Sequence, residues 1–346
     1  MLALLRNMNI QENISILPLN TFRMNGRARF LAVYESTDEL RYILQHKAEL
    51  FGNKNIPVLC IGEGSNLLFT KDFEGVLLRS SMRRARAVRE TADEVFIEAD
   101  AGLCMDDLIA QLTDMQLYGL ENLSYIPGTV GASAVQNVGA YGVEAKDVID
   151  QVRVLNIQDL NEITLSQADC RFGYRDSCFK HGQGKKYIVS AVTYRLSKQP
   201  VYHLEYGQLS QQLPSQPTAN QIRQAVIRIR QSKLPDVHKV GSAGSFFKNP
   251  VVSKDVYNNL RHSYIDIPSY SVGDGSEYKI PAAWLIEKSG CKSFAVGDAT
   301  VWQPQPLVLV NQHNAEPQDI VQLAQMIVNR VNRQFGIELQ REVIYI

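Results

Sequence analysis

The chain has 346 residues, with 36 basic and 36 acidic side chains, so its formal net charge at pH 7 is zero. Apolar residues make up 45% and charged residues 21%, which is typical of globular proteins and excludes a disordered or fibrous one. At roughly 150 residues per domain, this length predicts two or three domains. The neutral charge balance argues against a protein whose main task is to bind nucleic acid.

Membrane, disulfide and metal-binding classes are also disfavoured by the sequence. No apolar run approaches the ~20 residues that a membrane-spanning helix needs. The 5 cysteines are widely spaced without a CxxC pair, and the 6 histidines lack metal-ligand spacing, so we expect neither a disulfide framework nor a metal site. Cysteines of this kind fit a reducing cytoplasm. A metal-free cytoplasmic enzyme is the favoured class.

The first part of the chain alternates short predicted strands with helices. Ser36 and Glu39 have the spacing of a capping box, which predicts a helix that begins after Ser36. An amphipathic helix is expected at 103–117, and its apolar face consists of Leu108, Ile109, Leu112 and Met115. Strands are expected at 57–61 (buried), 67–69, 75–78 and 94–98 (half-exposed). This order predicts an α+β fold and not a regular parallel βαβ array.

The second part of the chain continues the α+β pattern after a break in composition. Residues 197–221 are polar and contain three of the prolines, so they form the best candidate linker, with the main boundary near residue 218. The remaining expected elements are strands at 151–157 and 187–196, a basic amphipathic helix at 222–230, a helix at 320–331 and a closing strand at 343–346.

A first glycine-rich segment, Gly62-Glu63-Gly64-Ser65-Asn66, follows a predicted strand. Its glycines let the backbone approach a ligand, and the N–H groups, the Ser65 hydroxyl and the Asn66 amide can bind phosphate oxygens without a lysine. It is not the Rossmann fingerprint, because Leu67 replaces the third glycine and a strand follows. A simple hairpin turn is the alternative interpretation.

A second segment, residues 127–142, is rich in glycine and alanine and has no charged side chain. Small side chains allow the backbone to lie against a large planar ligand, and Thr129, Ser133, Gln136 and Asn137 can supply directional hydrogen bonds. Close packing of helices or strands is the alternative. Two phosphate-capable segments without a Walker lysine point to a dinucleotide, with a flavin as the favoured one.

Three further side chains have the chemistry of a reactive site. Arg175, in Cys170-Arg171-Phe172-Gly173-Tyr174-Arg175, could clamp a carboxylate, although a solvated surface turn is the alternative. Ser245 lies between a glycine and two phenylalanines, which predicts a tight turn beside an apolar wall and a hydroxyl that could donate a proton; an ordinary turn serine is the alternative. Glu342 lies among apolar residues, either on a solvated face or as a buried acid with a raised pKa.

These segments, taken in this order, resemble the UDP-N-acetylenolpyruvoylglucosamine reductase family over nearly the whole chain. The matching pieces are GEGSNLLF, IPGTVGASAVQNVGAYG, CRFGYRDS, KLPD with GSFFKNP, PAAWLIEKSG and LQREV. Tyr206-Gly207 resembles the tyrosine loop of the longer, first type of this family. The resemblance implies an α+β fold with an FAD-binding domain of the vanillyl-alcohol-oxidase (PCMH) type and a smaller C-terminal α+β substrate domain. It implies a first FAD-binding subdomain at residues 1–70, joined by the C-terminal strand at 336–346, and a second FAD-binding subdomain at 71–218. Residues 219–335 are implied to form the substrate-binding domain.

The resemblance also implies the reaction. NADPH reduces non-covalently bound FAD, which then passes hydride to C3 of UDP-N-acetylglucosamine enolpyruvate, and Ser245 protonates C2 to give UDP-N-acetylmuramate. The product belongs to peptidoglycan precursor synthesis, and so to cell-wall biogenesis, cell shape and cell division. Arg175 and Glu342 match the residues that engage the substrate carboxylate and the developing enolate, with Glu342 protonated or acting through a water. A monomer is implied.

The remaining implied contacts divide into two sets. The residues implied to bind FAD are Gly62, Gly64, Ser65, Asn66, Pro127, Gly128, Thr129, Gly131, Ala132, Ser133, Asn137, Gly139, Ala140 and Tyr141. Those implied to bind the substrate are Tyr174, Tyr206, Lys233, Asn249, Tyr270, Lys292 and Gln305. The sequence departs from the family pattern at Arg341, where proline is common, and at Ile344, where arginine is common.

Two rival functions remain open to test. A flavin oxidase of the same superfamily often attaches FAD covalently to histidine or cysteine, and neither glycine-rich segment contains a histidine. A catalytically silent nucleotide-sugar-binding protein is disfavoured because Arg175, Ser245 and Glu342 are all present.

Overall fold

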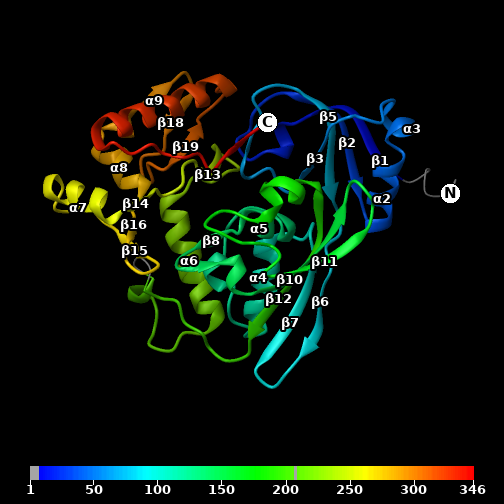
Figure 1. The fold of residues 1–346 in the computed structure, drawn as a ribbon, viewed down its shortest axis with the longest axis horizontal. Helices are drawn as coiled ribbons and strands as arrows, with labels where there is room; N and C mark the ends of the chain where they lie inside the picture. Colours follow the sequence, from blue (N-terminus) through cyan, green and yellow to red (C-terminus); the bar gives the residue numbers. More distant parts are fainter. Residues whose placement is uncertain (1–7, 206–208) are drawn as a thin grey trace. The chain divides into compact units, whose positions relative to one another are not determined.

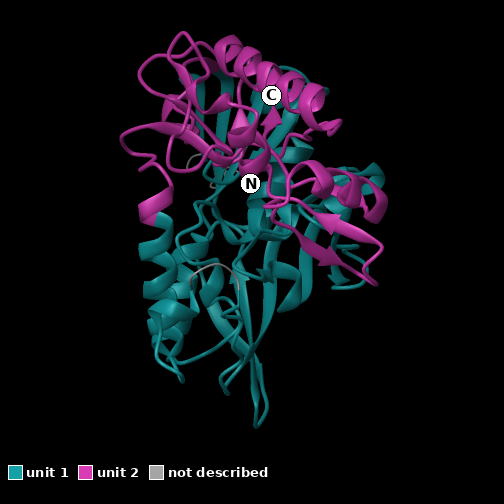
Figure 2. Ribbon diagram, turned by 90° about the vertical axis from the view of Figure 1, so that its left-hand side faces the viewer, with its two compact units in different colours: residues 1–14, 28–63, 73–230 teal, residues 15–27, 64–72, 231–346 magenta. Residues whose placement is uncertain are grey.

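The computed structural model describes residues 8–205 and 209–346, so the predicted substrate residue Tyr206 lies outside the described part. The chain divides into two compact units, coloured in Figure 2. Unit 1 comprises residues 1–14, 28–63 and 73–230, and unit 2 comprises 15–27, 64–72 and 231–346. The boundary between them falls within α6 (Ala219–Lys233). Each unit is therefore built from pieces that are far apart in the sequence.

The first sheet of unit 1 carries a capped helix. Its strands, side by side in Figure 1, are β1 (Asn9–Ser15), β2 (Arg27–Tyr34), β5 (Phe73–Ser80) and β3 (Val58–Ile61). α2 (Thr37–Gln45) begins after Ser36, whose hydroxyl accepts a hydrogen bond from the Glu39 N–H at 3.1 Å, as predicted. The Glu39 carboxylate accepts a hydrogen bond from the N–H of Glu35 at 2.7 Å, whereas a capping box would use the N–H of Ser36. Strand β3 is an edge strand with Cys60 exposed, so the predicted burial of this strand was wrong.

The second sheet of unit 1 is antiparallel and packs against two helices, α4 (Met105–Asp114) and α5 (Val130–Gln136). Its strands, in order, are β11 (Glu162–Ser166), β10 (Ile149–Asn156), β12 (Tyr187–Ser197), β7 (Glu94–Asp100) and β6 (Ala85–Glu90). β7 is mostly buried and not half-exposed as predicted, because β12 and β6 flank it and α4 and α5 share its core. Met115 was predicted on the apolar face, but it is exposed because α4 ends at Asp114.

In its described residues, unit 2 combines three small sheets, of four, three and two strands, with helices around one core. The apolar face of α9 (Pro317–Phe335) packs on β19 (Val308–Asn311), and Phe22 and Leu68 belong to the same core. The other elements are α7 (Lys254–Ser263), α8 (Ala282–Lys288), β13 (Gly241–Ser245), β14 (Val251–Ser253), β15 (Tyr270–Val272), β16 (Glu277–Lys279), β17 (Ala295–Val296) and β18 (Ala299–Val301). At the end of the chain, β20 (Ile344–Tyr345) runs parallel to β4 (Leu67–Leu68).

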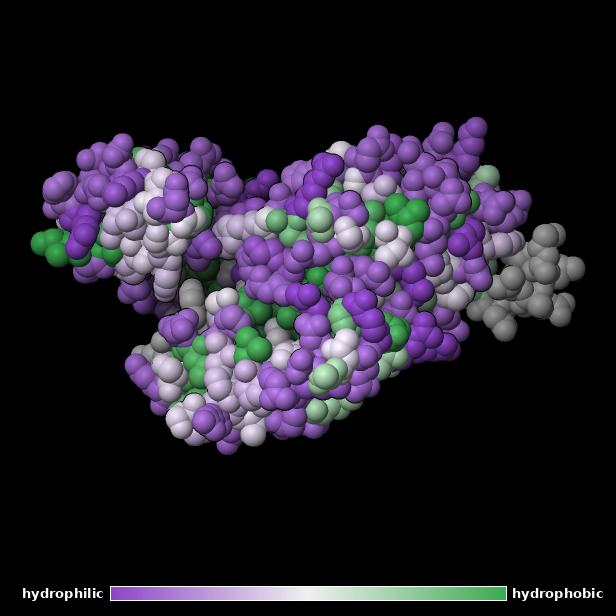
Figure 3. Space-filling model, turned by 60° about the horizontal axis from the view of Figure 1, so that its bottom comes forward, coloured by the Kyte–Doolittle hydropathy of each residue, from purple (hydrophilic) through white to green (hydrophobic). Residues whose placement is uncertain are grey.

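The exposed large apolar side chains of the described residues lie at scattered positions along the chain. On the face drawn in Figure 3, hydrophilic residues predominate and hydrophobic ones form small patches. The most exposed large apolar side chains, Ile265 and Met115, lie on different units. None of the helices in the described ranges has the length and apolar character needed to cross a bilayer.

Candidate functional site

Within unit 1, the fold brings the two glycine-rich segments together. Gly62 follows β3 and lies against the start of α5, where a Cβ on Gly62 would come 2.8 Å from Thr129 Oγ1. The N–H of Gly128 donates a hydrogen bond to the Glu63 carboxylate at 2.7 Å. Glu63 was not among the predicted site residues, because nothing local to it indicates a partner 65 positions away. Residues 62–63 and 128–132 are thus neighbours, as a shared ligand would require.

Several small residues of the second segment pack α5 in place. A Cβ on Gly131 would lie 2.9 Å from the Ala101 side chain. The Ser133 hydroxyl is buried, donates to the Val130 carbonyl at 2.7 Å and lies 2.9 Å from the Tyr194 hydroxyl. Thr129 caps α5 by accepting from the Ala132 N–H. These contacts are the close packing that the sequence offered as an alternative, and contact of these residues with a cofactor stays a prediction.

Arg175 reaches the second segment through a tightly held turn. Gly173 and Asp176 exchange backbone hydrogen bonds at 2.9 and 3.1 Å, and Arg175 between them has a left-handed backbone with φ 53°. The buried amide of Asn137 donates to the Gly173 carbonyl at 2.7 Å, which ties this turn to the end of α5. The Arg175 guanidinium donates to the carbonyl of Gly139. A Cβ on Gly139 would lie 2.7 Å from the same guanidinium, so the close approach requires glycine.

A second arginine, Arg230 of α6, contacts the same segment. Its Nε donates to the Tyr125 carbonyl at 3.0 Å, and its guanidinium hydrogen-bonds the Tyr141 hydroxyl. Burial lowers the pKa of Arg230, and the neighbouring positive charge of Arg175 lowers that pKa further. Burial also raises the pKa of Tyr141. The sequence analysis identified Arg230 only as a basic residue of its helix. Its contacts with Tyr125 and Tyr141 join distant parts of the chain and cannot be predicted from neighbouring residues.

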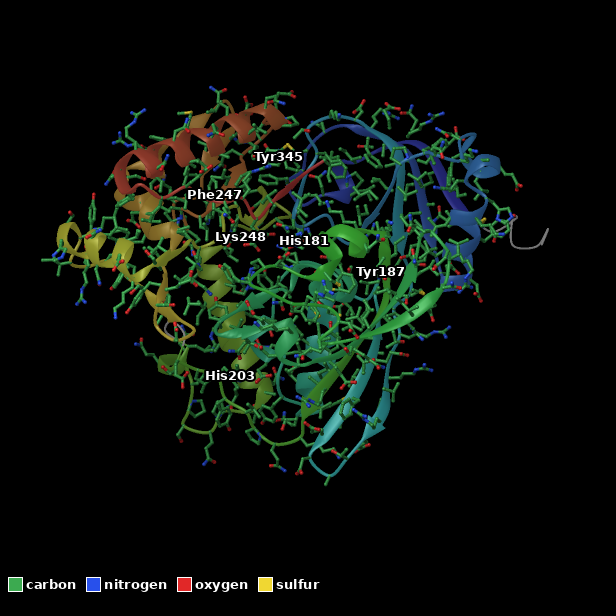
Figure 4. All side chains as sticks on the ribbon, in the orientation of Figure 1. His181, Tyr187, His203, Phe247, Lys248 and Tyr345 are labelled. Atoms are coloured by element: carbon green, nitrogen blue, oxygen red, sulfur yellow. The ribbon has the colours of Figure 1, made fainter. Side chains whose placement is uncertain are left out.

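In unit 2, three predicted site residues from distant parts of the chain become neighbours. The Glu342 N–H donates to the Phe246 carbonyl at 2.9 Å, and the Lys248 N–H donates to Gln340 at 2.8 Å, so this end of the chain runs antiparallel to the segment after Ser245. Phe247, Lys248 and Tyr345 mark these segments in Figure 4. The Asn66 side chain donates to the Glu342 carbonyl at 3.1 Å. The Asn66 side chain, the backbone of Glu342 and the backbone of Phe246, the residue after Ser245, are therefore linked by hydrogen bonds.

Ser245 lies at the end of a strand and not in the predicted tight turn. It is the last residue of β13 and pairs with Val308, and the pairing with β19 is interrupted between Ser242 and Ser245. Gly244 has a positive φ of 69°, which a bulge of this kind uses and which other residues rarely adopt. The bulge leaves Ser245 exposed in unit 2, while Phe246 and Phe247 are fully buried behind it. Glu342 is half-buried.

Gly64 is required by both its backbone and its surroundings. Its φ is +64°, and a Cβ would lie only 2.1 Å from the Leu19 carbonyl oxygen. This contact joins the first glycine-rich segment to residues 19–21, where the Thr21 N–H donates to the Gly64 carbonyl at 3.4 Å.

We expect Gly64→Ala to be strongly destabilising, by about 3 kcal/mol or more, because left-handed strain and a steric clash add. Gly336→Ala is the matched control, since Gly336 has a φ of +67° and nothing within 4 Å of an added Cβ. The control should cost only about 1 kcal/mol. Denaturant unfolding of both variants measures the difference, and equal losses would contradict the steric argument.

One predicted substrate residue, Lys292, lines a pocket of unit 2, and two others, Lys233 and Gln305, are bonded through their backbones to Trp302 of that pocket. The Trp302 indole N–H donates to the Lys233 carbonyl at 2.9 Å, and Gln303 donates to the Lys292 carbonyl at 2.7 Å. The Gln305 N–H donates to Trp302 at 3.1 Å. Lys292, Trp302 and Gln303 line a pocket of about 380 Å³. Trp302 was missed by the sequence reasoning, although an aromatic residue near predicted ligand residues was an available signal.

The other predicted substrate residues form separate groups. The Asn249 carboxamide oxygen accepts from the Ala282 N–H at the start of α8, at 2.9 Å. β14, β16 and β15 form a three-stranded sheet in this order. Tyr270 is exposed and pairs with Lys279, which also pairs with Val251, so Asn249 and Tyr270 lie toward the same end of this sheet. Tyr174 lies in unit 1, with the Arg175 guanidinium 5.4 Å from its ring centre.

The two departures from the family pattern are accommodated within unit 2. The Arg341 guanidinium lies over the Tyr345 ring at 3.8 Å, and Ile344 is exposed and pairs with Leu67. Among the residues that the structure describes, no group of three or more His, Cys, Asp or Glu side chains could hold a metal ion.

Comparison with known proteins first defines the class. Residues 28–159 match the family model described as FAD binding domain. A solved structure, the UDP-N-acetylenolpyruvylglucosamine reductase from Thermus caldophilus, shares the fold with a TM-score of 0.69, at 22% identity over 98% of this chain and 99% of that one. The chain is therefore an α+β oxidoreductase with an FAD-binding domain, and the fold class expected from the sequence is confirmed.

The C-terminal match and several similar proteins over nearly the whole chain identify the family. Residues 236–346 match the model of the UDP-N-acetylenolpyruvoylglucosamine reductase C-terminal domain. Reductases of this name from Bacteroides fragilis and Pseudomonas aeruginosa are each 41% identical over 97% of this chain, covering 100% and 98% of their own lengths. The one from Pasteurella multocida is 42% identical over 95% of both chains. The chain belongs to the UDP-N-acetylenolpyruvoylglucosamine reductase family.

Proposed function

We propose that this protein binds FAD non-covalently and uses NADPH to reduce UDP-N-acetylglucosamine enolpyruvate to UDP-N-acetylmuramate, a step of peptidoglycan precursor synthesis. Family membership supports the substrate class. The observation that carries the proposal is the grouping of the predicted residues: Arg175 with Gly139 in unit 1, and Asn66 with Glu342 and the segment after Ser245 in unit 2.

The residues near the glycine-rich segments have suitable chemistry for FAD. Residues 62–63 and 128–132 offer a close-packed backbone with small side chains, and two arginines, Arg175 and Arg230, provide positive charge beside 139–141. Backbone N–H groups and cations of this kind suit a pyrophosphate and an electron-rich ring system. When bound there, FAD would supply the redox chemistry for transfer of hydride between NADPH and C3 of the enolpyruvyl group.

Arg175 stabilises the negative charge that grows on the substrate. Hydride addition at C3 leaves an enolate at C2 and the adjoining carboxylate, and a fixed guanidinium stabilises such charge without having to reorganise. The turn from Gly173 to Asp176 and the bond to Gly139 hold the guanidinium in position. The same guanidinium fork can bind a carboxylate with two hydrogen bonds.

Ser245 donates the proton to C2, and Glu342 assists at the same substrate. A serine hydroxyl is a weak acid, so it can protonate only a strongly basic carbon such as the enolate, in a site from which water is excluded. Glu342 is held beside the Ser245 strand by the bond from its N–H to Phe246. Its carboxyl group acts on the enolate in the protonated form or through a water, because an ionised carboxylate would repel the developing charge.

The uridine diphosphate binds in unit 2. Lys292 lines the pocket of about 380 Å³, with its ammonium group 3.3 Å from the Glu287 carboxylate, and the backbone of Lys233 is bonded to Trp302 of the same pocket. Two lysines balance the charge of a pyrophosphate. Asn249, Tyr270 and Gln305 add hydrogen-bond donors and acceptors for the nucleotide.

Purified protein is expected to be yellow and to release intact FAD on heating or acid treatment. Non-covalent binding follows because residues 62–66 and 127–142 contain neither histidine nor cysteine that could form a flavin bond. Absorption spectra before and after denaturation, with chromatography of the released flavin, provide the measurement. Colourless protein that FAD cannot reconstitute would overturn the proposal, and flavin that stays with the denatured chain would favour the covalent oxidase instead.

A further inference from the structure

The buried carboxamide of Asn122 contacts the second glycine-rich segment in unit 1. Asn122 belongs to a short 3-10 helix, Glu121–Leu123, and is 2% exposed. Its Nδ2 donates to the Tyr141 carbonyl at 2.8 Å and to the His203 carbonyl at 2.7 Å. A primary amide nitrogen has two hydrogens, so both are used, each on a different segment. His203 is labelled in Figure 4.

The short helix that carries Asn122 is itself firmly anchored. The buried Glu121 carboxylate accepts from the Gly119 N–H at 2.6 Å, and the Ser124 hydroxyl donates to the Glu121 carbonyl at 2.6 Å. Burial raises the pKa of Glu121. Asn122 therefore belongs to a buried segment that is held together by its own hydrogen bonds, and its amide joins two other segments to it.

Tyr141 is held at both ends. Its backbone is left-handed, with φ 48°, which is unfavourable for a residue with a side chain. Asn122 bonds its carbonyl, and Arg230 bonds its hydroxyl. Tyr141 also packs against the apolar cluster of α6 that contains Ile222 and Val226. Such a conformation persists only where the surroundings impose it, and these contacts supply that constraint.

We propose that Asn122 is a positioning residue of the FAD site. It holds Tyr141 in the left-handed conformation and so fixes the backbone path of residues 139–141. The Gly139 carbonyl in this stretch accepts the hydrogen bond from the Arg175 guanidinium. The inference rests on the proposed function, because it assumes that residues 139–141 contact FAD. Asn122 acts through Tyr141 and Arg175, without touching cofactor or substrate.

The test compares Asn122→Leu with Asn311→Leu. Asn311 is a buried asparagine of unit 2 that also donates to two carbonyls, those of Phe22 and Arg23 at 3.2 and 3.3 Å, but lies outside the predicted site set. Both variants should lower the melting temperature of the FAD-free protein. Only Asn122→Leu should raise the dissociation constant for FAD, by about tenfold, and so reduce the stabilisation that added FAD gives.

A kinetic measurement separates positioning from simple loss of stability. At saturating FAD, we expect Asn122→Leu to raise the KM for the enolpyruvyl substrate by about tenfold, since Arg175 is displaced, with flavin reduction by NADPH about unchanged. Should Asn122→Leu not fold, Asn122→Ser provides the test, because its hydroxyl keeps one hydrogen-bond donor. We expect it to raise the dissociation constant for FAD and the KM by about threefold each.

Three results decide the matter. Unchanged FAD affinity and KM in the Asn122 variants would overturn the inference while the wild-type activity upholds the proposed function. An equal loss of FAD affinity in Asn311→Leu would overturn it as well, because the effect would then follow stability alone. Wild-type protein that binds no FAD would overturn the proposed function, and this inference with it.

Discussion

Replacing Ser245 by alanine should lower the rate at which the enolpyruvyl substrate reoxidises the reduced protein by about 10²–10⁴-fold, the usual cost of losing a general acid. Reduction by NADPH should be about unchanged, because that half-reaction needs no proton at C2. The substitution removes only the hydroxyl from an exposed strand end, while Phe246 and Phe247 keep their buried positions. Stopped-flow measurement of each half-reaction separates the two rates.

The control for this variant is Ser263→Ala. Ser263 is an exposed serine of unit 2 at the end of α7 and has no predicted role in the site. It should leave both half-reactions about unchanged, since an exposed surface substitution seldom matters. Equal slowing of both half-reactions in Ser245→Ala would reject the proton-donor role and would indicate a general disturbance of the site instead.

The sequence could predict features that depend on neighbouring residues. The cap of α2 follows from Ser36 and Glu39, three residues apart, and the structure has the Ser36 bond as expected. The apolar spacing of α9 likewise follows from its own turn geometry. Chemical motifs such as the glycine-rich segments depend on short stretches, and for that reason they could be recognised before the fold was known.

Features set by distant contacts could not be predicted. The apolar run of β3 predicted a buried strand and the alternating sequence of β7 a half-exposed one, yet β3 is an edge strand and β7 is mostly buried, because burial depends on which strands pair with them. Ser245 was expected in a turn, but pairing with Val308 makes it the end of a strand, and Gly244 serves the bulge. Asn122 and Arg230 carry no local signal, since their partners are carbonyls and a phenol from other segments.

Replacing Arg175 by lysine should lower kcat/KM for the enolpyruvyl substrate by about 10²–10³-fold, the range found when one stabilising donor of a developing oxyanion is lost. Lysine keeps the positive charge but lacks the planar fork, so it cannot bond the Gly139 carbonyl and a substrate carboxylate with the same geometry. The effect should fall on the substrate half-reaction, while FAD binding and reduction by NADPH change little.

Arg171→Lys is the matched control because Arg171 lies in the same loop, is exposed, and also has a left-handed backbone, with φ 46° against 53° for Arg175. Any strain or charge effect common to the loop would appear in both variants, whereas loss of the guanidinium at the substrate appears only in Arg175→Lys. We expect the control to retain about the wild-type kcat/KM. Equal losses of kcat/KM in the two variants would show that the loop conformation matters and not the Arg175 guanidinium. A fully active Arg175→Lys would show that positive charge alone suffices, without bidentate hydrogen bonding.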